Sequence, residues 1–153
     1  MLAIAGLASD VHGAMRRAAA GLKKIGRLTV SVNPFVPKSF TPLESAAFAE
    51  PAALSKRLKI LRERLGRVGN TRLTALSPRM ARLQCVFARG DRRAGGLAEA
   101  LAEGRTPAQA MRMFAELVER CVGAQPEGGA ARPWSVIEPP AASGKKMRKG
   151  SLN

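Results

Sequence analysis

The residues best suited to bind a ligand lie in the segment Ser31-Val-Asn-Pro-Phe-Val-Pro-Lys-Ser-Phe-Thr-Pro42, which directly follows the apolar run Leu28-Thr-Val30. This segment combines hydroxyl, amide and ammonium side chains with three prolines. Because proline lacks an N–H and fixes φ, a strand must end here and the chain must leave it extended. The carboxyl end of a parallel strand is where α/β folds bind ligands. The pattern therefore predicts a strand followed by a rigid, polar, ligand-binding loop.

Other side chains with catalytic potential are few. His12 is the single histidine, and a capping or solvent-facing position is a better interpretation of it than a catalytic base. Cys85 and Cys121 fall among apolar neighbours on predicted helices, which indicates buried, reduced thiols. The sequence contains no glycine-rich phosphate loop, no group of metal ligands and no Ser/His/Asp set. It therefore indicates no independent hydrolase or transferase.

Three short apolar segments have the pattern of parallel strands. They span residues 2–6, 27–33 and 71–76. Residues with helical spacing connect the first two segments, so these two form a βαβ unit whose crossover should be right-handed. The sequence thus predicts a parallel sheet of about three strands.

A long amphipathic helix is predicted between the second and third strands, beginning at Pro51 and ended by Gly66 and Gly69-Asn70. Its apolar positions recur at helical spacing: Leu54, Leu58, Leu61, Leu65 and Val68. Glu44 to Glu50, which precedes it, has no clear preference. The helix should pack its leucine stripe against the sheet.

The later helices have recognisable start and stop signals. Ser77-Pro78 begins one helix, with Met80, Leu83 and Phe87 expected to face inward. Gly90 should end it and Asp91 should cap the next, which explains the Arg-Gly-Asp tripeptide better than a cell-adhesion role does. A capping box at residues 106–109 begins a last helix, expected to run through Cys121.

Composition favours a small, basic globular protein. The 153 residues are 46% hydrophobic but only 4% aromatic, and the net charge is +15. One modest domain with an aliphatic core fits these numbers. Such a charge favours anionic partners, although arginine and alanine enrichment from a GC-rich genome explains it equally well. We expect a cytoplasmic protein without a signal peptide or a membrane span.

Basic residues gather on two predicted helices. Arg79, Arg82, Arg89 and Arg93 are expected to share one face that could hold phosphates, and the helix from Pro51 carries a second group. That second group comprises Lys56, Arg57, Lys59, Arg62, Arg64 and Arg67. Aromatic residues do not alternate with either set, so base stacking is not indicated. A solvated face is the competing interpretation for both.

Three segments, in this order, are similar to the radical S-adenosylmethionine (radical SAM) enzymes, in particular to the cobalamin-associated type. Ser31 to Pro42 resembles the family's SVNPFVPKPFTP. Leu83-Gln84 followed by Arg89-Gly-Asp-Arg-Arg93 resembles LQALLSRGDRR. Ile4 to Asp10 resembles the strand end GLPTE, although Ala8 and Asp10 stand in place of its proline and glutamate.

The resemblance implies a role for particular residues. It places Gly6 near the adenosine of S-adenosylmethionine, Ser31 and Asn33 near its methionine part, and Lys38 as an anion contact. The family also uses a [4Fe–4S] cluster and, in this type, cobalamin. Its Cys-x3-Cys-x2-Cys motif, which holds the cluster, is absent here. We therefore expect no cofactor to bind to this chain alone, and we assign it no catalytic or metal-binding residue.

The fold implied by the resemblance is α/β: a partial (β/α) barrel of about three parallel strands with flanking helices and a C-terminal helical extension. Residues 1–76 would supply the last strands and helices of the barrel, and residues 77–122 the extension. Residues 123–153 would form a mostly flexible basic tail with Trp134 docked on the domain.

A barrel of this expected kind would be incomplete, because three strands cannot close a barrel and Met1 would begin almost inside a strand. We therefore expect a truncated or split gene product that is not catalytic alone. A complementing chain with the N-terminal half is a candidate partner. The alternatives are a small basic nucleic-acid-binding module, or a subunit that completes another protein's barrel.

Overall fold

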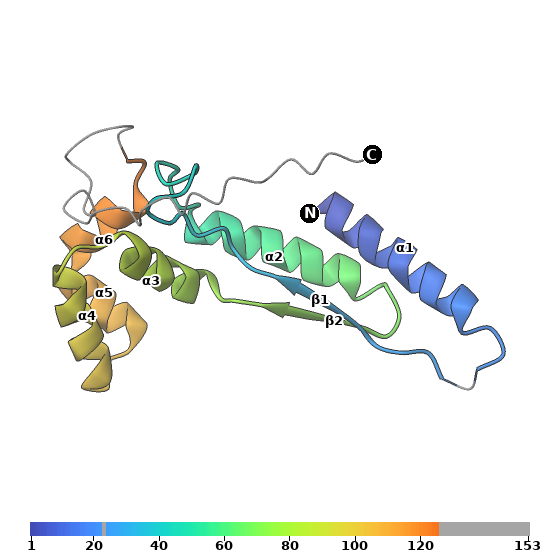
Figure 1. Cartoon of the computed structure of the whole chain (residues 1–153). Helices are drawn as coiled ribbons and strands as arrows, with labels where there is room; N and C mark the ends of the chain where they lie inside the picture. The colour runs from blue at the N-terminus through green and yellow to red at the C-terminus, as the bar shows by residue number, and fades with distance from the viewer. Residues whose placement is uncertain (23, 126–153) are drawn as a thin grey trace, which may run out of the picture.

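The computed structural model describes residues 1–22 and 24–125, which form six helices and one two-stranded sheet. The elements in chain order are α1 (Leu2–Ala18), β1 (Leu28–Val32), α2 (Pro51–Leu65), β2 (Thr71–Ala75), α3 (Pro78–Arg89), α4 (Arg93–Ala102), α5 (Pro107–Met113) and α6 (Ala115–Val122). Figure 1 shows α1 and α2 on the same side of the strands, whereas α3 to α6 gather beyond the strands' carboxyl ends. A sheet-and-helix layer is thus joined end to end with a helical cluster.

The first predicted strand, residues 2–6, is wrong, because these residues begin helix α1. Three of residues 2–8 are alanine, which favours helices, and Ile4 is the one β-branched residue among them. Ile4 and Ala8, four residues apart, both contribute to the cluster that packs on the sheet. A short apolar run has no periodicity of its own, so this packing decides between helix and strand.

The other two predicted strands are confirmed as β1 and β2. They pair in parallel, with Val30 opposite Leu73. The side chains of Leu28, Val30 and Leu73 pack beneath α1 and α2, while Thr29 and Ser31 on the opposite face are exposed. Because the described residues hold two strands and begin with a helix, the expected partial barrel of about three strands is wrong.

Helix α2 begins where it was predicted and ends at Leu65, so Val68 of the predicted stripe lies beyond it. Pro51 occupies the first turn, where its missing N–H has no intrahelical partner to lose. Leu54, Leu61 and Leu65 of the predicted stripe are buried, and Gly66 follows the last helical residue. The helix therefore links the sheet to the helical cluster: Leu61 and Leu65 pack near the strands, and Leu54 packs near α3.

Of the predicted helix signals in the C-terminal part, Ser77, Gly90 and the capping box are confirmed, whereas the N-cap of α4 is Arg92 and not Asp91. The Ser77 hydroxyl accepts a hydrogen bond from the Met80 N–H (3.2 Å), and Thr106 and Gln109 form a reciprocal capping box. The Asp91 carboxylate accepts a hydrogen bond from the Arg93 N–H (2.9 Å) at the start of α4. These caps satisfy N–H groups that have no partner within their own helices.

The predicted last helix is two helices, α5 and α6, separated at Phe114. The backbone of Phe114 (φ −112°, ψ 36°) lies outside the helical region. A Cβ at Gly96 of α4 would lie 3.0 Å from Cζ of the Phe114 ring, so this ring packs against α4 at a position that glycine leaves open. The break thus accompanies close packing of Phe114 on the neighbouring helix.

The buried side chains form three clusters, which match this layout. One lies between α1, α2 and the sheet, and another joins α3 to α4, α5 and α6. The third connects these two, with Phe48, Leu54, Ala81 and Cys85 at its centre. The division near residue 76 stays a prediction, and Trp134 lies outside the described residues.

Candidate functional site

The loop after β1 is tied to the end of the neighbouring strand. The Asn33 side-chain oxygen accepts a hydrogen bond from the Leu76 N–H (3.1 Å), just beyond β2. Pro37, four residues later, is fully buried. The predicted proline-rich loop therefore begins from a fixed point, and Asn33 holds the carboxyl ends of both strands together.

A tight turn presents Lys38 to solvent. The Thr41 hydroxyl donates to the Lys38 carbonyl (2.8 Å), and the Phe40 N–H donates to the Glu44 carboxylate (2.7 Å). Phe40 has a φ of 61°, in the left-handed region that side chains with a Cβ disfavour. The surrounding hydrogen bonds stabilise this strained conformation. Strain of this kind is concentrated at functional sites.

This loop packs on helix α3, far away in the sequence. The Ser39 hydroxyl donates to the Ala88 carbonyl (2.9 Å). Beside this bond lies a hollow of about 410 Å³, with Lys38 on the loop side and Gln84 and Phe87 on the helix side. The two segments most similar to the radical SAM family, 31–42 and 83–93, therefore meet in space. An ammonium group, an amide and a 44%-exposed aromatic ring border one hollow.

Arg89 is a residue whose position the sequence analysis missed. It was expected on a solvated basic face, but it is completely buried. Its guanidinium donates to the carbonyls of Ala46 (2.9 Å) and Gly123 (3.2 Å), which lie in the loop before α2 and directly after α6. Arg89 follows Cys85 by four residues and so falls on the apolar face of α3. This spacing from Cys85 was the sequence signal that could have indicated the burial of Arg89.

The expected basic face of Arg79, Arg82, Arg89 and Arg93 is wrong for a related reason. Helix α3 ends at Arg89, so Arg93 belongs to the separate helix α4 and pairs with Asp91 (3.0 Å). The inward positions also differ, since Leu83 is buried but Met80 and Phe87 are exposed. Only Arg79 and Arg82 remain on a shared surface.

The four residues assigned by the resemblance do not all come together. Ser31 is exposed on the uncovered face of β1, and Asn33 and Lys38 follow it along the same segment. Gly6 lies in α1 instead of at a strand end. Apart from its own helix backbone and chain neighbours, no described atom lies within 4 Å of where a Gly6 Cβ would be. Of these four residues, Lys38 borders the hollow and Asn33 fixes the start of its loop, whereas neither Ser31 nor Gly6 lines that hollow.

The cysteines are buried, as predicted, and do not fit an iron–sulfur cluster. The Cys85 thiol donates to the Cys121 carbonyl (3.5 Å). Burial raises the pKa of the Cys85 thiol and raises that of Cys121 to about 11, so both stay protonated at neutral pH. Within the described part of the chain, no group of three metal-ligating side chains occurs.

His12 is neither a cap nor fully solvent-facing. It lies within α1 and is half-buried. A Cβ at Gly69, in the turn before β2, would lie 3.6 Å from its ring. The histidine therefore packs where α1 meets the start of β2, away from the loop that bears Lys38.

Comparisons of the chain with family models, with curated proteins and with solved structures found no match. Among the residues described, no helix has both the length and the apolar character needed to cross a bilayer. The site must therefore be interpreted from its own chemistry and from the resemblance of its segments.

Proposed function

We propose that this chain is the C-terminal part of a radical SAM protein of the cobalamin-associated type, and that it does not catalyse a reaction alone. Ser31 and Lys38 contact S-adenosylmethionine, and Asn33 positions their loop. The role of Gly6 rests on the resemblance alone. A complementing polypeptide supplies the cysteines, and the parent activity is reductive cleavage of S-adenosylmethionine at a [4Fe–4S] cluster.

The meeting of two family-like segments is the observation that supports this proposal best. Residues 31–42 and 83–93 are about 50 positions apart, yet the Ser39–Ala88 hydrogen bond joins them beside the hollow that Lys38 borders. Segments that resemble one family and form one site are more informative than either segment alone. Lys38 offers an ammonium group for a carboxylate, and Phe87 offers an apolar surface.

The cluster itself does not fit this chain. Three thiolates must hold it so that one iron stays open, and the sequence has two cysteines, both buried and protonated. Among the described residues, one edge of β1 has no partner strand, and a strand from a complementing polypeptide can add there by backbone hydrogen bonding. Cluster chemistry therefore requires a second stretch of protein in this proposal.

The test combines the full chain with the polypeptide encoded directly upstream of its start codon. We expect that polypeptide to contain Cys-x3-Cys-x2-Cys, and the anaerobically reconstituted mixture to cleave S-adenosylmethionine. Lys38→Ala should weaken S-adenosylmethionine binding to the mixture about tenfold, the loss of one charge-assisted hydrogen bond. Lys24→Ala, at another exposed lysine, is the matched control. An upstream sequence without the motif, or a stable cluster on the isolated chain, contradicts the proposal.

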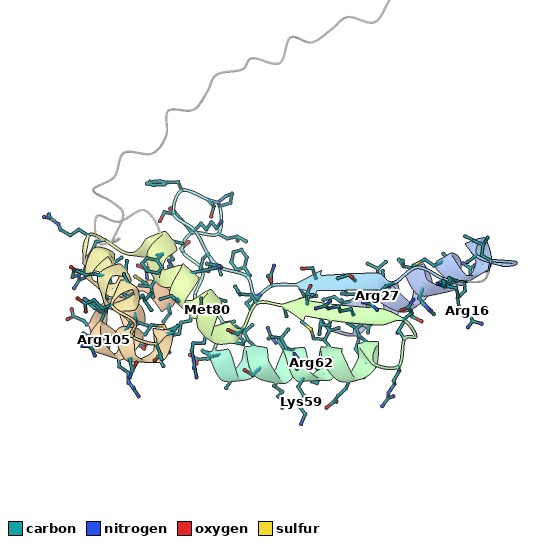
Figure 2. All side chains as sticks on the ribbon, turned by 90° about the horizontal axis from the view of Figure 1, so that it is seen from below. Arg16, Arg27, Lys59, Arg62, Met80 and Arg105 are labelled. Carbon is teal, nitrogen blue, oxygen red and sulfur yellow. The ribbon has the colours of Figure 1, made fainter. Side chains whose placement is uncertain are left out.

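A second candidate function, nucleic-acid binding, is favoured by the exposed face of α2. All six basic side chains of the set 56–67 are exposed, five of them on α2 and Arg67 two residues beyond its end, and Glu63 is the one acidic residue among them. Figure 2 shows Lys59 and Arg62 on α2, with Lys59 on the side away from the strands. Within the described residues, the recorded ion pairs all lie in the C-terminal helical cluster, so α2 keeps its positive charge. Phosphodiester backbones are the complementary partner.

Salt dependence tests this second function. The full chain should bind a labelled DNA duplex or single-stranded RNA, as measured by fluorescence anisotropy, with affinity that falls steeply as salt rises. Replacing Lys56, Lys59 and Arg67 by glutamine should lower the slope of log K against log salt by about 0.9 per lost phosphate contact. Arg105→Gln, remote from α2, should leave the slope unchanged. Equal effects of both variants would exclude α2 as the binding surface.

A further inference from the structure

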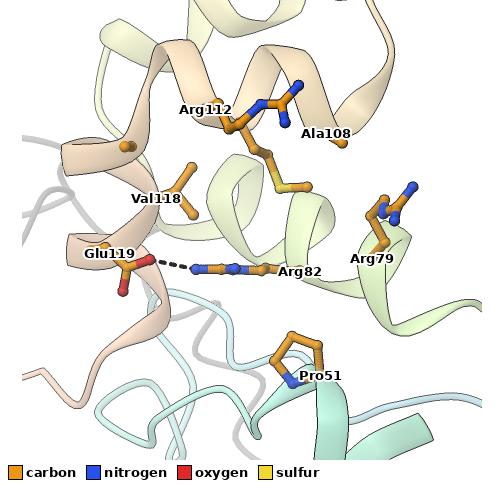
Figure 3. A pocket seen from close by; sticks show the side chains of 9 residues that line it. Pro51, Arg79, Arg82, Ala108, Arg112, Val118 and Glu119 are labelled. Carbon is orange, nitrogen blue, oxygen red and sulfur yellow. Dashed lines mark hydrogen bonds and ion pairs between the residues drawn. The ribbon is translucent and has the colours of Figure 1, made fainter.

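A cavity of about 320 Å³ lies between α3, α5 and α6, beside the first residue of α2 (Figure 3). Three arginines border it: Arg79 and Arg82 from α3, and Arg112 from α5. Met111 and Val118 supply apolar surface between them. The volume is that of a small-molecule site, and apolar walls with a few polar groups are typical of such sites. This cavity is separate from the hollow at Lys38.

The charges around the cavity do not balance. Arg82 pairs with Glu119, as Figure 3 shows by the dashed line. For Arg79 and Arg112, no ion pair or side-chain hydrogen bond with another described residue is recorded. The lining therefore carries three positive charges and one negative charge, a net charge of +2. Like charges brought together repel one another, and a dianion would remove this repulsion.

Rigid elements present these arginines. The Ser77 cap fixes the start of α3, two residues before Arg79. The capping box of Thr106 and Gln109 fixes the start of α5, which carries Arg112. Val118 is buried in the core shared by α3, α5 and α6. Capped helices hold the side chains of a binding site in place more precisely than loops do.

We propose that this cavity binds a small organic phosphomonoester. The guanidinium groups of Arg79 and Arg112 hold the phosphate from opposite helices, since arginine presents a planar set of donors suited to phosphate oxygens. Arg82 stays oriented by Glu119 and adds a third positive charge. The organic group lies against Met111 and Val118. The inference is independent of the radical SAM proposal, because it requires neither S-adenosylmethionine nor a cluster.

Calorimetric titration of the full chain at low salt tests this site, with phenyl phosphate as the probe. Inorganic phosphate reports the contribution of the anion alone, and phenylacetate distinguishes a phosphate site from a general carboxylate site. We expect phenyl phosphate to bind at least about tenfold more tightly than either, because both the dianion and the ring find complementary surface. Equal affinity for inorganic phosphate, or tighter binding of phenylacetate, overturns the proposal.

Matched variants locate the binding. Arg79→Gln and Arg112→Gln should each weaken phenyl phosphate binding about tenfold, the loss of one charge-assisted contact. Arg105→Gln removes an exposed arginine next to the same helices but outside the cavity lining, and should have no effect. An equal loss in Arg105→Gln would mean attraction by net charge only. If a variant fails to fold, NMR of the arginine Nε–H groups in the wild type decides: resonances of Arg79 and Arg112 must shift on titration.

Discussion

At the scale of single residues, Arg89 is the charged side chain on which the arrangement of the loops depends most. It is buried, and it connects α3 to the loop before α2 and to the segment after α6 through two backbone carbonyls. A buried cation is tolerated only when oriented oxygens replace its water. If the guanidinium were removed, the Ala46 carbonyl would lose this donor, and the Gly123 carbonyl would keep the Gln125 side-chain amide (3.2 Å). Arg89 therefore stabilises the loop that carries Lys38.

We predict that Arg89→Met lowers the free energy of unfolding by about 2–4 kcal/mol, because the half-buried Ala46 and Gly123 carbonyls each lose a charged donor. Chemical denaturation of the full chain measures the change. Arg92→Met is the matched control: its side chain is exposed three residues later, and it should change stability by less than about 0.5 kcal/mol. Similar values for both variants would show that Arg89 is solvated.

The Cys121 thiol predicts a dependence of stability on alkaline pH. Burial raises its pKa from 9.0 to about 11, so the folded state holds the proton more tightly than the unfolded state does. Its contribution to stability is complete below pH 9.0 and is lost as pH rises from there to about 11. Denaturation at several pH values should show this decline, and Cys121→Ala should flatten it. An unchanged slope in that variant would assign the decline to other groups.

At the scale of elements, the joint between α3 and α4 depends on Gly90. Its φ of −76° is ordinary, but a Cβ there would lie 2.6 Å from the Val86 carbonyl oxygen, too close for any real contact. The glycine therefore allows α3 to end and the chain to turn within a few residues. This turn brings Asp91 into contact with Arg93.

A pair of glycine substitutions tests this joint. Gly90→Ala should destabilise the protein by about 1–3 kcal/mol, because the new methyl group forces the backbone to shift. Gly95→Ala, within α4, meets nothing within 4 Å and should stabilise by about 0.5–1 kcal/mol through helix propensity. Thermal unfolding of both variants measures whether each substitution lowers or raises the stability of the protein. A neutral Gly90→Ala would show that the joint adapts freely.

The same elements show how far sequence reasoning extends. Caps and turns were predictable because their signals are local: Ser77, Thr106 and Gly90 act within one helical turn. The strands β1 and β2 were predictable from β-branched runs bounded by prolines and glycines. The later part of helix α1 was predictable from its helical spacing, but its first residues were not, because they form an apolar run that suits either structure. Arg112 could not be placed without knowing which helices pack together, whereas the burial of Arg89 had a local signal in its four-residue spacing from Cys85.

At the scale of the whole molecule, stability is distributed unevenly between the two ends. In α1 the single buried residue is Ala8, while Leu2 and Leu7 remain 64% and 66% exposed. In α3, by contrast, Ala81, Leu83, Cys85, Val86 and Arg89 are all buried. Burial of apolar surface is the main source of stability. The N-terminal helix should therefore be the least stable of the long elements.

Hydrogen exchange of the full chain, measured by mass spectrometry, tests this gradient. We predict that peptides covering residues 2–18 exchange at least about tenfold faster than those covering 78–89, because local opening of α1 exposes little buried surface. Ala8→Leu adds side-chain volume at the one buried position and should either overpack the contact or strengthen it. In both cases the hydrogen-exchange rate of α1 must change, while the exchange rate of α3 stays constant. Equal protection of α1 and α3 in the wild type would mean that the chain unfolds as one cooperative unit, with the sheet layer as stable as the helical cluster.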